Sequence, residues 1–79
     1  MDIAVEISMY PLSKDYLAPI QDFIDRLHAN ERLVVQTNTM STQVLGDYDD
    51  VCNALREAMR VSLQAGPKAV FVTKFLPRD

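Results

Sequence analysis

The densest group of side chains able to bind a ligand lies in the middle of the chain. It consists of five consecutive residues, four of which carry an amide or a hydroxyl: Asn38, Thr39, Met40, Ser41 and Thr42. Amides and hydroxyls supply donors and acceptors at short range, and a methionine sulfur packs well against an aromatic ring. This combination suits a small heteroaromatic ligand. The alternative is a well-bonded turn in which Met40 fills a gap in the core.

Other kinds of site lack the side chains that they need. With Gly46 and Gly66 as the only glycines, no glycine-rich phosphate loop can form. The single histidine, His28, and the single cysteine, Cys52, are far apart, which disfavours a zinc site. No Ser-His-Asp or Cys-His set can be placed within one subunit. We therefore expect no metal site, no cofactor, no catalytic residue and no enzyme activity.

Length and charge limit the class of protein. A chain of 79 residues with 48% hydrophobic and 24% charged residues is typical of one small globular domain, here residues 1–79. Such a domain has a marginal core, so open apolar surface tends to recruit a second copy. The net charge of −3, without a Lys/Arg run, disfavours nucleic-acid binding. No apolar run reaches the ~20 residues of a membrane span and no signal peptide is visible, so we expect a cytoplasmic protein without membrane contact.

Two periodic segments open the chain. Residues 3–10 alternate between apolar and mostly polar positions, which predicts a strand with one buried face. Residues 17–27 carry apolar side chains at spacings of three and four, which predicts an amphipathic helix. Asp15 is a suitable N-cap for this helix, and Asn30 is a suitable end because asparagine tolerates the left-handed conformation.

The second half predicts three more strands and one helix. Residues 33–37, 42–45 and 69–75 are expected strands, and residues 38–41 connect the first two as a hairpin. Gly46 is expected to close the second of these strands. Carboxylates at residues 47–50 favour a helix start, and Gly66-Pro67 favours its end.

This order of elements predicts a βαββαβ, ferredoxin-like α+β sandwich, with a four-stranded antiparallel sheet and both helices on one face. The strands at 3–10 and 42–45 should be the two central ones. Ser8 and Thr42 are then expected side by side on the open face, with Glu6 two residues along, as a polar floor. The register of the last strand stays open, so this face carries either Phe71 and Phe75 or Val70 and Val72.

Three segments resemble the YkoF-like thiamine-binding family. They are Glu6-Ile7-Ser8-Met9-Tyr10-Pro11-Leu12, then Thr39-Met40-Ser41-Thr42 with Gly46-Asp47, and finally Ala65-Gly66-Pro67-Lys68. The resemblance covers nearly the whole chain and implies a ferredoxin-like fold. It also implies binding of thiamine or its hydroxymethylpyrimidine moiety, in salvage or transport, by a homodimer or homotetramer joined through its sheets.

The resemblance also implies the ligand contacts: Glu6, Ser8, Asn38, Thr39, Met40, Ser41 and Thr42. The Glu6 carboxylate could bind the amine of an aminopyrimidine or offset the charge of a thiazolium ring. The alternative for Glu6 is a solvated position on the open sheet face.

Two other functions stay open. The first is a dimeric α+β-barrel enzyme, such as a small monooxygenase or isomerase, for which Tyr10 and Glu6 are the candidate catalytic residues. The second is a pure assembly module, whose open face only joins subunits. The sequence leaves open whether the ligand is thiamine, a thiamine phosphate or another heterocycle, and whether a transporter is a partner.

Overall fold

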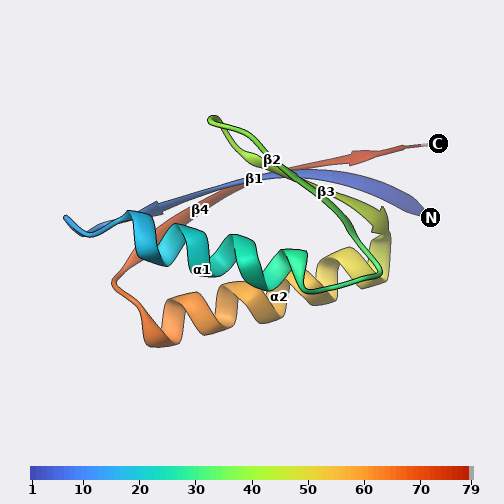
Figure 1. The fold of residues 1–79 in the computed structure, drawn as a ribbon. Helices are drawn as coiled ribbons and strands as arrows, with labels where there is room; N and C mark the ends of the chain where they lie inside the picture. Colours follow the sequence, from blue (N-terminus) through green and yellow to red (C-terminus); the bar gives the residue numbers. More distant parts are fainter. Residues whose placement is uncertain (79) are drawn as a thin grey trace.

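The computed structural model describes residues 1–78 as a four-stranded sheet with two helices. The elements are β1 (Asp2–Pro11), α1 (Leu17–His28), β2 (Val34–Thr37), β3 (Thr42–Asp47), α2 (Tyr48–Ala65) and β4 (Ala69–Pro77). The strand order is β2-β3-β1-β4, and every neighbouring pair is antiparallel. Both helices lie on the same side of the sheet (Figure 1). The predicted ferredoxin-like sandwich is therefore confirmed.

The core lies between the sheet and the two helices. Alternation along β1 directs every second side chain toward the helices. Each helix buries the apolar side chains of one of its faces against this side of the sheet. The buried apolar residues are Ile3, Val5, Ile7, Met9, Phe23, Leu27, Leu33, Val44, Val51, Leu55 and Ala58. Within residues 1–78, neither helix is both long and apolar enough to cross a bilayer.

The register of β4 settles which of its side chains share the open face. Ser8 lies opposite Val72 and Tyr10 lies opposite Val70 in the β1–β4 ladder. Because directly paired residues point to the same face of a sheet, Val70 and Val72 belong to the open face. Phe71 points toward the helices, where its ring lies 5.0 Å from that of Phe23.

Two strands, β3 and β4, run two residues past their predicted ends. β3 continues through Gly46 instead of ending there, so the prediction that Gly46 closes the strand is wrong. A Cβ atom at Gly46 would lie 3.3 Å from Cδ2 of Leu33 and 3.4 Å from Cγ2 of Val51. The glycine thus permits β3 to pass close to α2. β4 runs on to Pro77 because its ladder with β1 continues to the Ile3–Pro77 pair.

The ends of α1 differ from the prediction. Its N-cap is Tyr16, without a side-chain cap, and not Asp15. No non-glycine residue within residues 1–78 has a positive φ, so Asn30 does not end the helix in a left-handed conformation. Its Oδ1 instead accepts a hydrogen bond from the Arg32 N–H at 3.0 Å. A polar side chain therefore organises the turn after the helix.

The start of α2 agrees with the prediction from its carboxylates. Asp47 is the N-cap, and its Oδ2 accepts hydrogen bonds from the N–H groups of Asp49 at 3.2 Å and Asp50 at 3.4 Å. These are two of the N–H groups that a helix start leaves without a partner. This cap fixes the direction in which the chain leaves β3.

Candidate functional site

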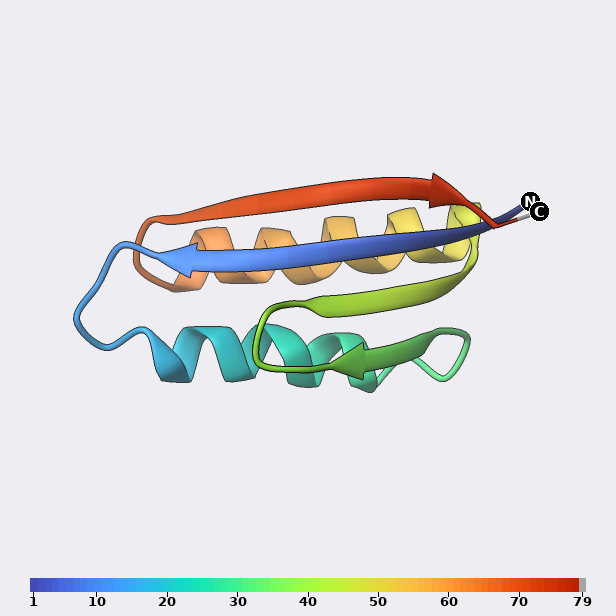
Figure 2. The same ribbon diagram turned by 90° about the horizontal axis from the view of Figure 1, so that it is seen from above.

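The sheet is uneven at one end. The β1–β3 ladder stops at the Ile7–Thr42 pair, whereas the β1–β4 ladder continues to Pro11–Ala69. Figure 2 shows the β2–β3 hairpin turning back while β1 and β4 continue past it. A cavity of about 390 Å³ lies here, between the end of β1, the hairpin and α1. Its volume falls within the range of small-molecule sites.

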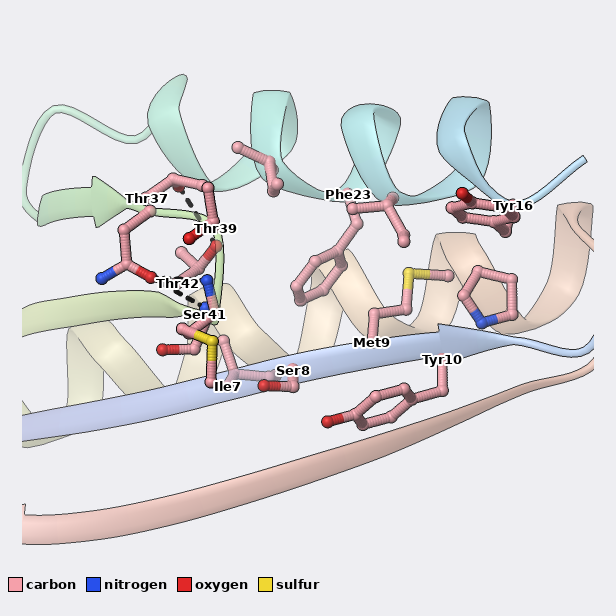
Figure 3. A pocket seen from close by; sticks show the side chains of 15 residues that line it. Ile7, Ser8, Met9, Tyr10, Tyr16, Phe23, Thr37, Thr39, Ser41 and Thr42 are labelled. Atoms are coloured by element: carbon pink, nitrogen blue, oxygen red, sulfur yellow. Dashed lines mark hydrogen bonds between the residues drawn. The ribbon is translucent and has the colours of Figure 1, made fainter.

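One side of this cavity is apolar. Ile20, Phe23 and Ile24 line it from α1, and Ile7 and Met9 line it from β1. Figure 3 shows Phe23 reaching from α1 toward β1, with Met9 rising from β1 toward the helix. Walls of this kind exclude water from a flat ring and leave orientation to the polar groups nearby.

The hairpin forms the polar side. The Asn38 N–H donates to the Ser41 carbonyl at 3.1 Å, and Asn38 Oδ1 accepts from the N–H groups of Met40 at 2.8 Å and Ser41 at 3.0 Å. The hydroxyls of Thr37 and Thr42 lie 3.1 Å apart. The turn is therefore well bonded, as the alternative for this segment expects. Met40, however, is 84% exposed and does not fill the core.

Six of the seven residues predicted to contact a ligand surround this cavity. They are Ser8, Asn38, Thr39, Met40, Ser41 and Thr42. Glu6 does not line it. The fold thus brings together residues that are 30 positions or more apart, such as Ser8 and Asn38, but their contact with a ligand stays a prediction.

The expected polar floor of Ser8, Thr42 and Glu6 does not form, and this prediction is wrong. Thr42 pairs with Ile7, faces the helices and is 4% exposed. Ser8 pairs with Val72 and belongs to the opposite face. A shift of one residue in register moves a side chain to the other face. The short strand at 42–45 has two polar residues followed by two apolar ones, so it carries no alternation that fixes the register.

Glu6 instead holds the hairpin from the open face. Its Oε2 accepts a hydrogen bond from Ser41 Oγ at 2.9 Å, and its Oε1 lies 3.4 Å from Nζ of Lys74. The hydrogen bond from Ser41, followed by the contact with Lys74, lowers the pKa of Glu6 below its usual value of 4.5. The ionised carboxylate therefore connects β1 to one wall of the cavity and to β4.

Replacement of Ser41 by alanine is expected to bring the pKa of Glu6 back toward 4.5, because it removes the largest cause of the shift. Since the pKa is lowered in the folded protein, the contact stabilises the hairpin above pH ~4.5 and is lost as the pH falls through the lowered value. A ¹³C NMR titration of the Glu6 carboxyl measures this directly. Thr39→Ala is the control, and an unchanged Glu6 pKa in Ser41→Ala would contradict the assignment.

Sequence reasoning missed these aromatic and aliphatic residues of the cavity: Pro11, Tyr16, Ile20, Phe23 and Ile24; it considered Tyr10 only as a candidate catalytic residue. The apolar stripe of α1 was visible in the sequence, but its spacing only places residues on one face of the helix. Which of them meet the core and which line a cavity depends on where β1 and β3 end.

Comparison with solved structures agrees with this architecture. A hypothetical protein of Methanocaldococcus jannascii, MJ1052, is 28% identical, with a TM-score of 0.83 over 99% of this chain and 81% of that chain. Protein SP2199 of Streptococcus pneumoniae is 21% identical, with a TM-score of 0.90 over 100% of this chain and 89% of that one.

A third structure carries a functional description. Protein TM0486 of Thermotoga maritima, provisionally described as a thiamine biosynthesis or salvage protein, is 17% identical, with a TM-score of 0.75 over 99% of this chain and 85% of that one. At this identity the likeness concerns the fold. No curated protein is significantly similar. The model of the YKOF-related family, however, matches residues 2–75, and the chain therefore belongs to that family.

Proposed function

We propose that this chain is a small-molecule binding protein that takes thiamine or its hydroxymethylpyrimidine moiety into the cavity at the end of β1. The observation that carries the proposal is the pairing of an apolar wall from α1 and β1 with a polar wall from the hairpin. A flat heteroaromatic ring needs both kinds of wall. Membership of the YKOF-related family and the description of TM0486 support the same class of ligand.

The proposal excludes turnover of the ligand. Glu6 and Tyr10 were the candidate catalytic groups of the competing enzyme hypothesis. The Glu6 carboxylate is engaged by Ser41 and Lys74, outside the cavity, and so is poorly placed to act as a base. Tyr10 borders the cavity, but it is 54% exposed and its side chain belongs to the open sheet face, as its pairing with Val70 requires. Binding without chemistry is the simpler use of this arrangement.

The proposal also includes a homo-oligomer joined through the open face of the sheet. Five aliphatic side chains project from this face: Val34, Leu45, Val70, Val72 and Leu76. Val70 is 49% exposed, Val72 is 47% exposed and Leu76 is 65% exposed. They form two groups, one on each side of the row that holds Glu6 and Lys74, and exposed apolar groups on one face often mark an interface. A cytoplasmic location stays a prediction of the sequence.

A thermal-shift panel tests the ligand. Thiamine, thiamine phosphates and hydroxymethylpyrimidine are expected to raise the melting temperature, whereas unrelated heterocycles are not. At a ligand concentration ten times Kd, binding stabilises the folded state by about 1.4 kcal/mol. For a domain of this size that corresponds to a rise of about 5–10 °C. A panel without any shift would favour the assembly module, and a shift with unrelated heterocycles alone would point to another ligand.

A further inference from the structure

The last residues of β1 have a strand partner on one side only. β4 pairs with β1 as far as Pro11, but β3 ends at the partner of Ile7. Figure 2 shows this part of β1 extending past the hairpin. The edge of β1 that faces the hairpin is thus left without a neighbour beyond Ile7, and the cavity lies along it.

The pattern of hydrogen bonds shows which residue has its peptide groups on that edge. In an antiparallel strand, the N–H and C=O of one residue point to one neighbour, and those of the next residue point to the other. The Leu12 N–H donates to the Lys68 carbonyl at 2.7 Å, so even-numbered residues of this strand face β4. The Tyr48 N–H donates to the Met1 carbonyl at 2.8 Å, so odd-numbered residues face β3.

Met9 is the odd-numbered residue that lies beyond the end of β3. Continuing the register would pair it with Met40, but the Met40 N–H is donated to Asn38 Oδ1 at 2.8 Å. The β1–β3 ladder stops before Met9, and within residues 1–78 no turn, loop or side-chain group bonds to its N–H or C=O. Pro11, the next odd-numbered residue, has no N–H. The edge therefore offers a single donor, the Met9 N–H, with the Met9 C=O beside it as an acceptor, and Pro11 can add only a second acceptor.

These two groups belong to the wall of the cavity. Five successive residues, 7–11, line it, although their side chains alternate between the two faces of the sheet. The strand therefore borders the cavity with its backbone. Met9 as a whole residue is 8% exposed, and polar groups shielded from water without a partner cost free energy. A ligand that binds both groups removes this cost.

We propose that the Met9 peptide groups recognise the amidine edge of an aminopyrimidine in this cavity. The Met9 N–H donates to a ring nitrogen, and the Met9 C=O accepts from the adjacent exocyclic amine. The ring takes the place of the residue that β3 does not supply, and Phe23 and Ile20 cover it from α1. This inference rests on the proposed function and deepens it by naming the recognised edge. A peptide strand fits less well, because it needs several free donors and acceptors in a row.

The methionine amides give a direct test. The chain has four methionines, and Met1 carries the terminal amine, so protein labelled with ¹⁵N-methionine gives amide signals from Met9, Met40 and Met59. With saturating thiamine, we expect the Met9 amide proton to move downfield and its hydrogen exchange to slow about tenfold or more. Met59, in α2 and outside the cavity, is the internal control.

A matched ligand pair tests the direction of the bonds. A thiamine analogue with a 4-oxo group in place of the 4-amino group presents an acceptor to the Met9 C=O and an N–H donor to the Met9 N–H. It is expected to bind about tenfold more weakly or worse, as measured by titration calorimetry. An analogue with a pyridinium ring in place of the thiazolium keeps the aminopyrimidine edge, and its Met9 signal is expected to respond as it does with thiamine.

The outcomes separate this inference from the proposed function. If thiamine binds in calorimetry but the Met9 amide does not change, the inference is overturned and the proposed function stands. If no member of the thiamine set binds, the proposed function fails. The inference is then decided by the hydrogen exchange of the Met9 amide in the presence of 4-aminopyrimidine or pyridine at high concentration. Exchange that slows with 4-aminopyrimidine but not with pyridine supports the inference, and no change with either compound overturns it.

Discussion

Replacement of Ile20 by tryptophan is expected to abolish ligand binding while the protein stays folded. Ile20 lies on α1, packs beside the core and lines the cavity. The larger indole has room to enter the cavity of about 390 Å³, so it fills the space that the ligand needs. We expect the affinity for thiamine in titration calorimetry to fall at least about a hundredfold, which corresponds to about 2.7 kcal/mol.

The control for this variant is Leu63→Trp. Leu63 lies on α2, is 53% exposed and does not line the cavity, so the same change of side chain there should leave the affinity unaltered. Circular dichroism and the melting temperature report whether each variant is folded. Parental affinity in a folded Ile20→Trp protein would place the ligand elsewhere, most simply on the open face of the sheet.

The order of the elements could be predicted because its signals are local. Residues 3–10 alternate, residues 17–27 repeat at three and four, and both patterns need only neighbouring positions to be recognised. The carboxylate cap of α2 is local too, since Asp47 bonds to N–H groups two and three residues away. Element type and topology were therefore accessible before any tertiary contact was known.

The faces of β3 and β4 could not be predicted in the same way. Residues 69–72 are all apolar, so they carry no alternation that separates one face from the other. Their assignment depends on long-range pairs such as Ser8–Val72, and on the contact between Phe23 and Phe71. The Thr42 hydroxyl was expected on the open face. It is instead buried, and its hydrogen-bond partner is Thr37 Oγ1. Sequence patterns did not reveal this partner.

The cavity itself depends on a difference in length. It exists because β1 continues to Pro11 while β3 has no residue to pair with Met9. The predicted start of β3 at Thr42 is correct, and β1 runs one residue past its predicted end, but these positions alone do not show which residues of the two strands lie opposite each other. The hairpin residues could be identified by composition, whereas the aromatic wall and the unpaired edge of β1 required the register.

The second large effect concerns assembly. Replacement of Val72 by aspartate is expected to dissociate the proposed oligomer. Val72 projects from the open face beside Ser8 and is 47% exposed in the single chain, so its replacement removes no core contact. In a symmetric sheet-to-sheet interface each change occurs twice, and each would leave a carboxylate shielded from water without a dedicated partner.

For the parent chain, sedimentation velocity at micromolar concentration should show a dimer or tetramer, and for Val72→Asp a monomer with an unchanged circular dichroism spectrum. The expected weakening of assembly is at least about a hundredfold, because a buried unpaired charge costs several kcal/mol. Val70→Asp, two residues along the same face, should act alike, whereas Leu63→Asp on the exposed side of α2 should leave assembly intact. A monomeric parent chain would remove the proposed interface altogether. If the oligomer persists in both sheet variants, the interface must lie on another surface. Two carboxylates that face each other between packed sheets cannot both stay hydrated.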